Sequence, residues 1–502
     1  MVYDEAQPFD LSQVWPGMRV LRFCLSIHRA RSSVMPPERT DRTPMPVRDS
    51  EVKAHDSGQD NESYCFAQAM SEAERCLRCQ DPACIDGCPV RVPLAEFMQA
   101  VAAGDLPGAA GILRAANPLA AICGRACPEE PQCGKKCHMS KRFGPVAIGH
   151  VERCVSDWEM QQPRNAEAVE PWRDEKVAIV GSGPSGLVCA GELARLGYRV
   201  TVYEALHAPG GMLRYGNLEF RLPDSVLDWE LEGLERLGVE FVNDVIVGRT
   251  IRTEDLFEEF GYSAVFFGTG AGLPKFMGIP GESLNGVYSA DEFLTRINLM
   301  QAFGFPEAEA SLKVGKRVAV IGSGNSAMDA VRSALLLGAG QAMVLNSDSE
   351  NEMTARAEEY ERAKEEGVEF HWLTRTIEIL GEEGWVTGLR CVRMNPGEPD
   401  DSGRVRSKPI EGSEFILPVD NVVLSIGTRP NPLLSKSAPG LKPHSWGGLM
   451  VDERHVETSV HRVYAGGAVT GAATVILAAG AGKKAAEAIH ADLAADKEKA
   501  GA

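Results

Sequence analysis

The sequence predicts an α/β protein with two Rossmann-like dinucleotide-binding domains and, ahead of them, an α-helical domain rich in cysteine. Three observations lead to this prediction. Glycines in G-x-G-x-x-G spacing follow a short apolar run at 181–186, a G-x-G-x-x-A pattern follows another at 322–327, and eight of the thirteen cysteines lie between Cys76 and Cys137. A strand, a glycine-rich turn and a helix in this order start a dinucleotide-binding unit, and two such units are far more specific than one.

The bulk composition is that of a soluble globular protein with several domains. The chain has 502 residues, of which 44% are hydrophobic and 24% are charged, and its formal net charge is −18. This excess of negative charge argues against nucleic acid and anionic membranes as partners. The first residues lack the pattern of a signal peptide, and the uncharged stretch 463–482 is too rich in glycine and alanine for a membrane span. We therefore expect a cytoplasmic protein without membrane insertion, whose residues 1–50 form an extended arm.

Residues 51–165 are expected to form the cysteine domain. The cysteines have the spacings C-x2-C-x4-C-x3-C at 76–88 and C-x3-C-x5-C-x3-C at 123–137, and the stretch 94–117 between them is helical in pattern. The first array, which a proline follows, is similar to the run in bacterial ferredoxins, where three close cysteines hold one cluster and the fourth holds another. Iron–sulfur clusters are the favoured interpretation. Two structural zinc sites, or free thiols, are the alternatives.

The first nucleotide unit is expected to occupy 166–298 and 422–502. Gly181 makes the tight turn, Gly183 lets a pyrophosphate approach the backbone, and Gly186 lets the helix pack on the strand. Pro184 and Ser185 open the predicted helix, whose N-terminal N–H groups and positive dipole end face the phosphates.

Further residues of this unit are expected to contact the dinucleotide. Glu204 ends the strand 199–203, about 20 residues after the glycine turn, where a carboxylate can accept hydrogen bonds from a ribose. Adjacent glycines at 210–211 would let the backbone lie close to a flat ring, and the strand 264–267 also ends in glycines. The tail from residue 463 is expected to rejoin this domain and close over its ligand. The predicted contacts, besides Glu204, are Gly211, Met212, Leu213, Gly270, Gly467 and Thr474.

The second nucleotide unit is expected at 299–421. The strand 317–321 leads into the glycine turn, a helix continues over 328–337, and the next strand is 342–345. Residues 378–418 have the pattern of a β-meander. Two dinucleotides face to face are the usual arrangement for passing a hydride between a nicotinamide and a flavin. The predicted contacts of this unit are Gly322, Gly324, Asn325, Ser326, Ala327 and Asp348.

These landmarks together resemble the family of the glutamate synthase small (beta) subunit. Relatives of this family include the large subunit of the NADH-dependent ferredoxin:NADP oxidoreductase and the N-terminal half of dihydropyrimidine dehydrogenase. The resemblance covers about 42–493 and rests on ERCLRCQDPACIDGCPV, ICGRACPEEPQCGKKC, GPVAIGHVER, GSGPSG and GSGNSAMD. The stretch 268–296, with GTGAGLPKFMGIPGE and GVYSADEFLTR, favours the bifurcating branch.

The resemblance implies the cofactors and their ligands. FAD would bind to the first unit, NAD(H) or NADP(H) to the second, and two [4Fe-4S] clusters to the cysteine domain. From the residues alone Glu152 is a surface residue of a helix, and the resemblance reverses that interpretation. No side chain need act as acid or base, because flavin and clusters carry the redox chemistry. One cluster would use Cys76, Cys79, Cys84 and Cys137, and the other Cys88, Cys127, Cys133 and an oxygen of Glu152, with Cys123 spare.

Two positions depart from the family pattern. The family has an Asp in its C-terminal GGD turn, where this chain has Gly466, Gly467 and Ala468. The family also has paired arginines that grip the 2′-phosphate of NADP, where this chain reads LNSD over 345–348. An Asp repels a phosphate but accepts from ribose hydroxyls, so we expect NADH to be preferred over NADPH, with Arg356 as a cation that could compensate.

The sequence thus predicts an iron–sulfur flavoprotein oxidoreductase subunit that passes electrons between NAD(P)H and a partner subunit. That partner would be a glutamate synthase large subunit, or a ferredoxin or flavoprotein subunit. Two alternatives stay open. The chain could be the large subunit of a bifurcating ferredoxin:NADP oxidoreductase, or a non-catalytic relay or scaffold subunit with a decayed nicotinamide site.

Overall fold

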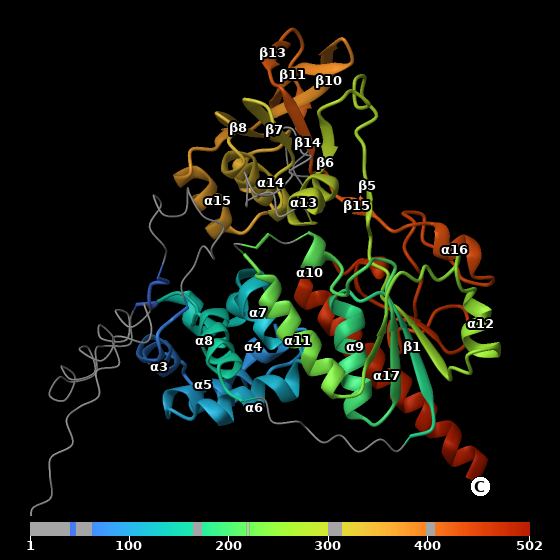
Figure 1. Cartoon of the computed structure of the whole chain (residues 1–502). Helices are drawn as coiled ribbons and strands as arrows, with labels where there is room; N and C mark the ends of the chain where they lie inside the picture. Colours follow the sequence, from blue (N-terminus) through green and yellow to red (C-terminus); the bar gives the residue numbers. More distant parts are fainter. Residues whose placement is uncertain are drawn as a thin grey trace, which may run out of the picture.

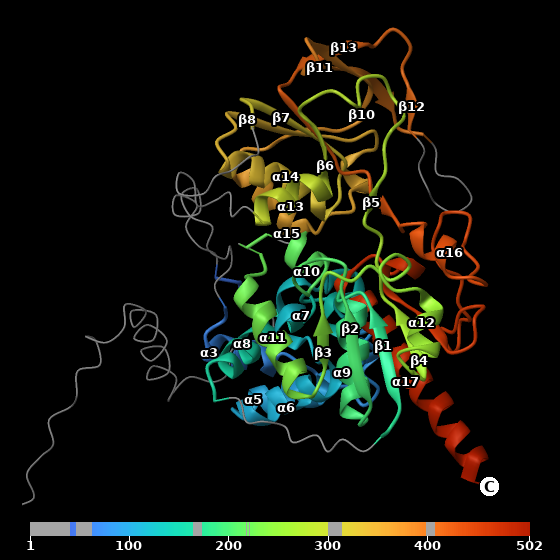
Figure 2. The same ribbon diagram turned by 45° about the vertical axis from the view of Figure 1, so that its right-hand side comes forward.

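Figure 1 shows an all-helical part, an α/β part that ends in the C-terminal helix, and a second α/β part above both. Turned by 45°, the helical part is again seen against the first α/β part (Figure 2). Most of the expected arm, 1–50, lies outside the described residues. The computed structural model describes residues 41–46, 63–163, 173–216, 218–219, 221–299, 314–397 and 407–501.

The cysteine domain consists of short helices. The stretch 94–117, expected to be helical, is two helices, because Gly104 takes a φ of +81° and Asp105 then caps the second helix by accepting a 2.9 Å hydrogen bond from the Gly108 N–H. The elements are α3 (Phe66–Glu74), α4 (Ala83–Asp86), α5 (Leu94–Ala102), α6 (Leu106–Ala116), α7 (Ala120–Ala126), the π-helix η2 (Glu130–Gly134), the 3-10 helix η3 (His138–Lys141) and α8 (Ile148–Met160).

The first α/β domain has a five-stranded parallel sheet. In order across the sheet, its strands are β16 (Val463–Ala465), β4 (Ala264–Phe267), β1 (Lys176–Val180), β2 (Arg199–Tyr203) and β3 (Glu240–Val242). The helix α9 (Pro184–Arg195) joins β1 to β2, and the C-terminal helix α17 (Val475–Gly501) packs on α9. The tail therefore rejoins the first domain, which confirms the expectation from the sequence.

Smaller elements surround this sheet. Two antiparallel strands of two residues each, β5 (Leu273–Pro274) and β15 (Thr428–Arg429), pair between the two α/β domains. The other elements are α10 (Met212–Tyr215), α11 (Asp224–Arg236), α12 (Thr253–Glu258), α16 (Leu433–Ser437) and the 3-10 helix η6 (Gly467–Thr470).

The second α/β domain repeats the parallel arrangement. Its sheet has, in order, β6 (Val287–Ser289), β14 (Asn421–Leu424), β7 (Arg317–Ile321), β8 (Gln341–Leu345) and β9 (Glu369–His371). An antiparallel group extends from it, made of β10 (Thr374–Glu382), β11 (Trp385–Asn395), β12 (Lys408–Pro409) and β13 (Phe415–Pro418). The helices are α13 (Ala290–Leu299), α14 (Asn325–Leu336), η5 (Glu350–Glu352) and α15 (Ala357–Glu365).

The sheet pairing shifts the domain boundaries from those drawn on the sequence. The strand β14 pairs with β6 on one side and with β7 on the other. Residues 287–299 and 421–424 therefore belong to the second sheet and its helices, whereas the expected boundaries placed 166–298 and 422–502 in the first domain. A three-residue strand such as β6 carries too little pattern to reveal its partner.

One hydrophobic core runs through the cysteine domain and the first α/β domain. Phe97 of α5, Ile122 of α7, Ile179 of β1 and Ile489 of α17 are all fully buried in it. The second α/β domain has separate cores on the two faces of its sheet. Among the described helices, none alone has the length and apolar composition to cross a membrane. Only α6 and α7 taken together have them, and this pair is bent by 89°.

Candidate functional site

The first glycine turn joins β1 to α9 and leaves one face of its backbone open. A Cβ on Gly181 would lie 2.6 Å from the Gly268 carbonyl oxygen, and one on Gly186 would lie 2.0 Å from the Gly181 carbonyl oxygen. Gly183 is different, because a Cβ there would meet only the Gly268 oxygen, at 4.0 Å. Two glycines thus close the turn, and the third leaves room at the start of α9 for a phosphate. This cradle fits a dinucleotide.

Glu204, at the end of β2, is buried and holds this turn in place. One carboxylate oxygen accepts a 3.0 Å hydrogen bond from the Ser182 N–H and another from the Ser182 hydroxyl. The other oxygen accepts from the Leu206 N–H at 3.0 Å. The Ser182 hydroxyl also accepts a 2.9 Å hydrogen bond from the Gly210 N–H. The structure therefore places Glu204, which we expect to bind a ribose, beside the first glycine turn. Through Ser182, Glu204 also connects this turn to the segment 210–211.

Two further segments meet at the first turn. Gly211 takes a φ of +53°, and a Cβ on it would lie 3.0 Å from the Cα of Gly183. Next to it, Met212 is exposed and Leu213 is buried. The Ser185 hydroxyl donates to the Gly466 carbonyl oxygen at 3.3 Å, and a Cβ on Gly467 would lie 2.4 Å from that hydroxyl.

The remaining predicted contacts of this unit lie at its edges. A Cβ on Gly270, whose φ is +70°, would meet nothing within 4 Å. The Thr474 hydroxyl accepts from the Leu477 N–H at 3.3 Å at the start of α17. The segments 181–186, 210–213 and 466–467 are thus brought together, while Gly270 and Thr474 flank them.

The second glycine turn joins β7 to α14. A Cβ on Gly322 would lie 2.2 Å from the Ser425 carbonyl oxygen, whereas one on Gly324 would meet only the Thr354 hydroxyl, at 3.5 Å. Asn325 accepts a 2.9 Å hydrogen bond from the Arg356 N–H through its side chain. Ser326 is exposed and Ala327 is buried. This turn repeats the closed-and-open pattern of the first, so it too fits a dinucleotide phosphate.

Asp348 and Arg356, both in the loop after β8, have different contacts. Asp348 is partly exposed, and it accepts a 3.3 Å hydrogen bond from the Ser407 hydroxyl. The Arg356 guanidinium lies 3.2 Å from a carboxylate oxygen of Glu358 and 3.8 Å from one of Glu130 in the cysteine domain. The predicted compensating cation is therefore engaged by two carboxylates.

Four cysteines form an outer group on the cysteine domain. Cys76, Cys79, Cys84 and Cys137 are partly exposed. Burial, followed by the charges of Cys137 and Cys76, raises the pKa of the Cys84 thiol to about 11. Burial likewise raises the pKa of Cys76, with Cys137 and Cys79 adding to the shift. The thiols of this group thus influence one another's charge. Their assignment to a single cluster comes from the family resemblance.

An inner group lies deeper in the same domain. Burial is the main cause that raises the pKa of Cys127, and Cys123, Glu152, Cys133 and Cys88 add to it. Burial, with the charge of Glu129, raises the pKa of Glu152 to about 8. A carboxyl group on α8 therefore faces the thiols. Among the described residues, no three His, Cys, Asp or Glu side chains converge in a geometry for a single metal ion.

Cys123, expected to be spare, lies in this inner group. It is 4% exposed, and its sulfur accepts a 3.1 Å hydrogen bond from the Asn117 side-chain amide. Burial, followed by the charge of Glu152, raises its pKa. The spacing within the second array gave no means to decide which of its four thiols would be left over.

The inner group adjoins the first α/β domain. A Cβ on Gly480 of α17 would lie 2.7 Å from the Cβ of Pro89, which follows Cys88. The Ala121 N–H of α7 donates a 2.8 Å hydrogen bond to Glu230 of α11. Lys483 of α17 donates to the carbonyl oxygens of Val90 at 3.1 Å and Ala116 at 2.7 Å. Neither Glu230 nor Lys483 belongs to a motif, so the sequence did not single them out.

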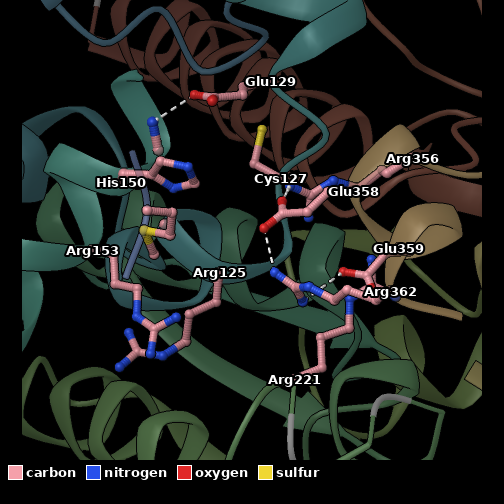
Figure 3. Close-up of a pocket in the computed structure, with 13 residues that line it drawn as sticks. Arg125, Cys127, Glu129, His150, Arg153, Arg221, Arg356, Glu358, Glu359 and Arg362 are labelled. Carbon is pink, nitrogen blue, oxygen red and sulfur yellow. Dashed lines mark hydrogen bonds and ion pairs between the residues drawn. The ribbon is translucent and has the colours of Figure 1, made fainter. Parts of the chain in front are cut away.

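A small cavity lined by charged side chains lies between the cysteine domain and the second α/β domain. It has a volume of about 30 Å³, and Cys127 lies on its wall. Figure 3 shows His150, Arg125 and Arg153 on one side and Arg221, Arg356, Arg362, Glu358 and Glu359 on the other. Burial and the charge of Arg42 lower the pKa of His150 to about 4. This set of residues was missed, because its members are scattered over the sequence.

Two family models match the chain. The one described as dihydropyrimidine dehydrogenase domain II, 4Fe-4S cluster, matches residues 53–164, and the one described as pyridine nucleotide-disulphide oxidoreductase matches residues 175–491. These matches confirm the predicted fold class and favour iron–sulfur clusters over zinc in the cysteine domain.

Curated relatives extend over most of the chain. The glutamate synthase [NADPH] small chain of Halomonas elongata is 35% identical over 436 residues, which are 85% of this chain and 91% of that protein. The small chain of Escherichia coli is 34% identical over 85% of this chain and 92% of its own length. The NADP(+)-dependent formate dehydrogenase subunit beta of Moorella thermoacetica is 37% identical, but this chain covers only 59% of it.

One solved structure gives a further likeness of fold. FprA of Mycobacterium tuberculosis in complex with NADPH has a TM-score of 0.56 and 22% identity, and the match covers 65% of this chain and 86% of that chain. At this identity the likeness concerns the fold alone.

Proposed function

Because this chain belongs to the glutamate synthase small-chain family of iron–sulfur flavoprotein oxidoreductases, we propose that it is the electron-transferring subunit of a larger enzyme. It passes electrons between NAD(P)H and a partner protein. When bound, FAD exchanges a hydride with the nicotinamide and single electrons with the iron–sulfur clusters. The chain's own residues bind and orient these groups and exclude water around them.

We assign the dinucleotides to the two glycine turns. FAD binds at 181–186, with Glu204 at its ribose and the segments 210–213 and 466–474 over it. The nicotinamide nucleotide binds at 322–327, with Asp348 at its ribose. This assignment rests on the free space next to Gly183 and Gly324. A Cβ on a neighbouring glycine of either turn would lie within 2.6 Å of a backbone atom.

We assign the clusters to the two cysteine groups. Cys76, Cys79, Cys84 and Cys137 hold the outer cluster. Cys88, Cys127 and Cys133, with the Glu152 carboxylate, hold the inner one. The contact of Pro89 with Gly480 supports this order, because it places the inner group against the domain that binds FAD.

The partner follows from the family. The matched relatives carry the names of small or beta subunits, so we propose that this chain works with a separate electron-accepting or electron-donating subunit. A glutamate synthase large subunit and a ferredoxin or flavoprotein subunit are the two kinds that fit. The thiol-rich sequence supports the cytoplasm as its compartment, because thiols stay reduced there.

Anaerobic mixing with NADH or NADPH tests this proposal. We expect the flavin absorption band to bleach, followed by the electron paramagnetic resonance signal of reduced clusters. Gly324→Val is the matched variant, because it fills the open face of the second turn while the first turn stays intact. It should keep its FAD and respond to dithionite but not to either nucleotide. No bleaching of the native protein by either nucleotide would overturn the proposal and favour a relay subunit.

A further inference from the structure

Basic side chains surround the outer cysteine group of a chain that is otherwise acidic. Arg78 lies between Cys76 and Cys79, and Lys135 and Lys136 directly precede Cys137. Lys141 and Arg142 follow, at the end of η3. The formal net charge of the whole chain is −18, so five cations around one group of thiols stand out from the rest of the molecule.

These five cations face the solvent. Arg78, Lys135, Lys136, Lys141 and Arg142 are all exposed. In the part of the chain that the structure describes, none of them forms an ion pair, whereas the other arginines of the cysteine domain, such as Arg75 and Arg125, pair with carboxylates. Among the described residues, the five cations outnumber the exposed carboxylates without an ion pair beside the same thiols, Glu74 and Asp81. The local potential is therefore positive and attracts the opposite sign.

Two large apolar side chains next to these cations in the sequence are exposed as well. Leu77 is 51% exposed and Phe143 is 40% exposed. The loop that presents Phe143 is held by Arg75, which is buried and donates to the carbonyl oxygens of Phe143 at 2.8 Å and Gly144 at 3.0 Å. Glu72, also buried, accepts from Arg75 at 2.5 Å. The surface is therefore formed before any partner arrives.

The contact between the cysteine domain and the domain that we assign to FAD comes from the inner group. The helix α3 leads into Cys76, and it packs on α5 and α8 within the cysteine domain. The inner group, by contrast, touches α17 through Pro89. A protein that docks over the outer group would reach the cofactor nearest to the solvent.

We infer that Arg78, Lys135, Lys136, Lys141 and Arg142, around Leu77 and Phe143, form the docking surface for a small acidic protein that carries one electron at a time. This inference rests on the proposed function and names the class of partner. Cationic rims steer acidic partners and set the rate of encounter, and transient redox interfaces are small, with an apolar centre. Nucleic acid does not fit, because the overall negative charge repels a long polyanion.

Binding of a plant-type [2Fe–2S] ferredoxin, an acidic one-electron carrier, to the complete protein with its cofactors tests the surface. We expect the dissociation constant to rise with ionic strength, because salt screens exposed charges. Lys141→Glu with Arg142→Glu should weaken binding about tenfold or more. Lys436→Glu with Lys442→Glu is the matched control, because it makes the same change in charge at two exposed lysines, one in α16 and one in the segment after it, away from the cysteine domain. It should bind as the native protein does.

A second measurement separates this inference from the proposed function. Two reduced ferredoxins supply two electrons, and NAD⁺ or NADP⁺ takes them up with one proton. The Michaelis constant for ferredoxin should rise in the charge-reversed variant, and basic cytochrome c should bind more tightly to it than to the native protein. Equal ferredoxin affinities for the variant and the control would overturn the docking surface. If ferredoxin binds as expected but no nucleotide bleaches the flavin, the proposed function fails and the docking surface stands.

Discussion

At the scale of single residues, the feature that departs most from ordinary cluster chemistry is a carboxyl group among thiols. Glu152 lies on α8, and burial together with Glu129 raises its pKa to about 8. A carboxyl group is costly to bury in its charged form unless a cation or a metal compensates it. A cluster iron bound to this oxygen would supply that compensation, and the exchange of a thiolate for a carboxylate would change the charge and potential of the cluster.

Glu152→Ala tests this role. We expect the variant to retain FAD and to lose about four of about eight irons, because one cluster lacks a ligand. Glu159→Ala removes another carboxylate from α8, one that pairs with Arg114 at 2.7 Å, and should keep all of its iron. Iron analysis and the spectrum of the reduced clusters are the measurements. An unchanged spectrum in Glu152→Ala would show that this carboxyl group is only structural.

Nucleotide choice also depends on single residues. A 2′-phosphate needs a cation, and in the loop 346–356, which the structure describes in full, the sole arginine is Arg356, already engaged by Glu358 and Glu130. Several relatives carry NADPH in their names, yet we predict that this chain is reduced at a lower concentration of NADH than of NADPH. Asp348→Arg should narrow or reverse the difference in affinity between NADH and NADPH. A change of about 1.4 kcal/mol in binding free energy is enough for a tenfold change in affinity. Stopped-flow flavin reduction with both nucleotides is the measurement, and a clear preference of the native protein for NADPH would contradict it.

At the scale of elements, buried charges hold the helices of the second α/β domain together. Arg332 of α14 is 1% exposed and lies 3.2 Å from Glu359 of α15 and 2.7 Å from Glu366. Burial alone would raise the pKa of Glu359, but the charges of Arg221, Arg362 and Arg332 lower it to about 2. The two helices are thus joined by an ion pair from which water is excluded.

Arg332→Met should loosen this contact. Without Arg332, the buried carboxylate of Glu359 keeps Arg221 and Arg362 but loses one of its cations. We therefore expect a cost in the free energy of unfolding below the value of about 3–5 kcal/mol for a fully uncompensated buried charge. Hydrogen exchange in α14 and α15 should therefore speed up, and Glu359→Gln added to the same variant should restore part of the protection. Arg296→Met is the control, because its pair with Glu292 is 43% exposed on both sides and such pairs contribute less than about 1 kcal/mol. The same exchange rates in both variants would disprove the role of Arg332.

Elements with strong local signals could be predicted from the sequence, and those that depend on distant pairing could not. The strands β1 and β2 and the helix α9 follow from apolar runs and glycine spacing, and the structure confirms them. The assignment of β6 to the second sheet depends on its pairing with β14, over 130 residues later, which no local pattern reveals. The contact of Arg356 with Glu130 likewise needs the folded chain.

At the scale of the whole molecule, the cysteine domain and the first α/β domain share a hydrophobic core, while charged contacts such as Arg356 with Glu130 join the second α/β domain to them. A single hydrophobic core joins the first two, and Lys483 and Glu230 add hydrogen bonds across their boundary. The second α/β domain has its own cores, and charged side chains line the cavity that separates it from the cysteine domain. Cluster loss should therefore affect FAD binding more than nucleotide binding.

Cys79→Ser tests this coupling. The anaerobically purified native protein should contain about eight irons and about eight acid-labile sulfides, and the variant about half of each. Because metal binding and folding are coupled, and the cysteine domain shares its core with the domain that we assign to FAD, the variant should also release FAD at a lower temperature. Cys391→Ser, which changes a buried thiol of β11 in the second α/β domain, should leave iron and flavin release unchanged. Flavin fluorescence during heating measures the release. A Cys79→Ser protein that lost half its iron but held FAD up to the native temperature would show that the two domains fold independently despite their common core.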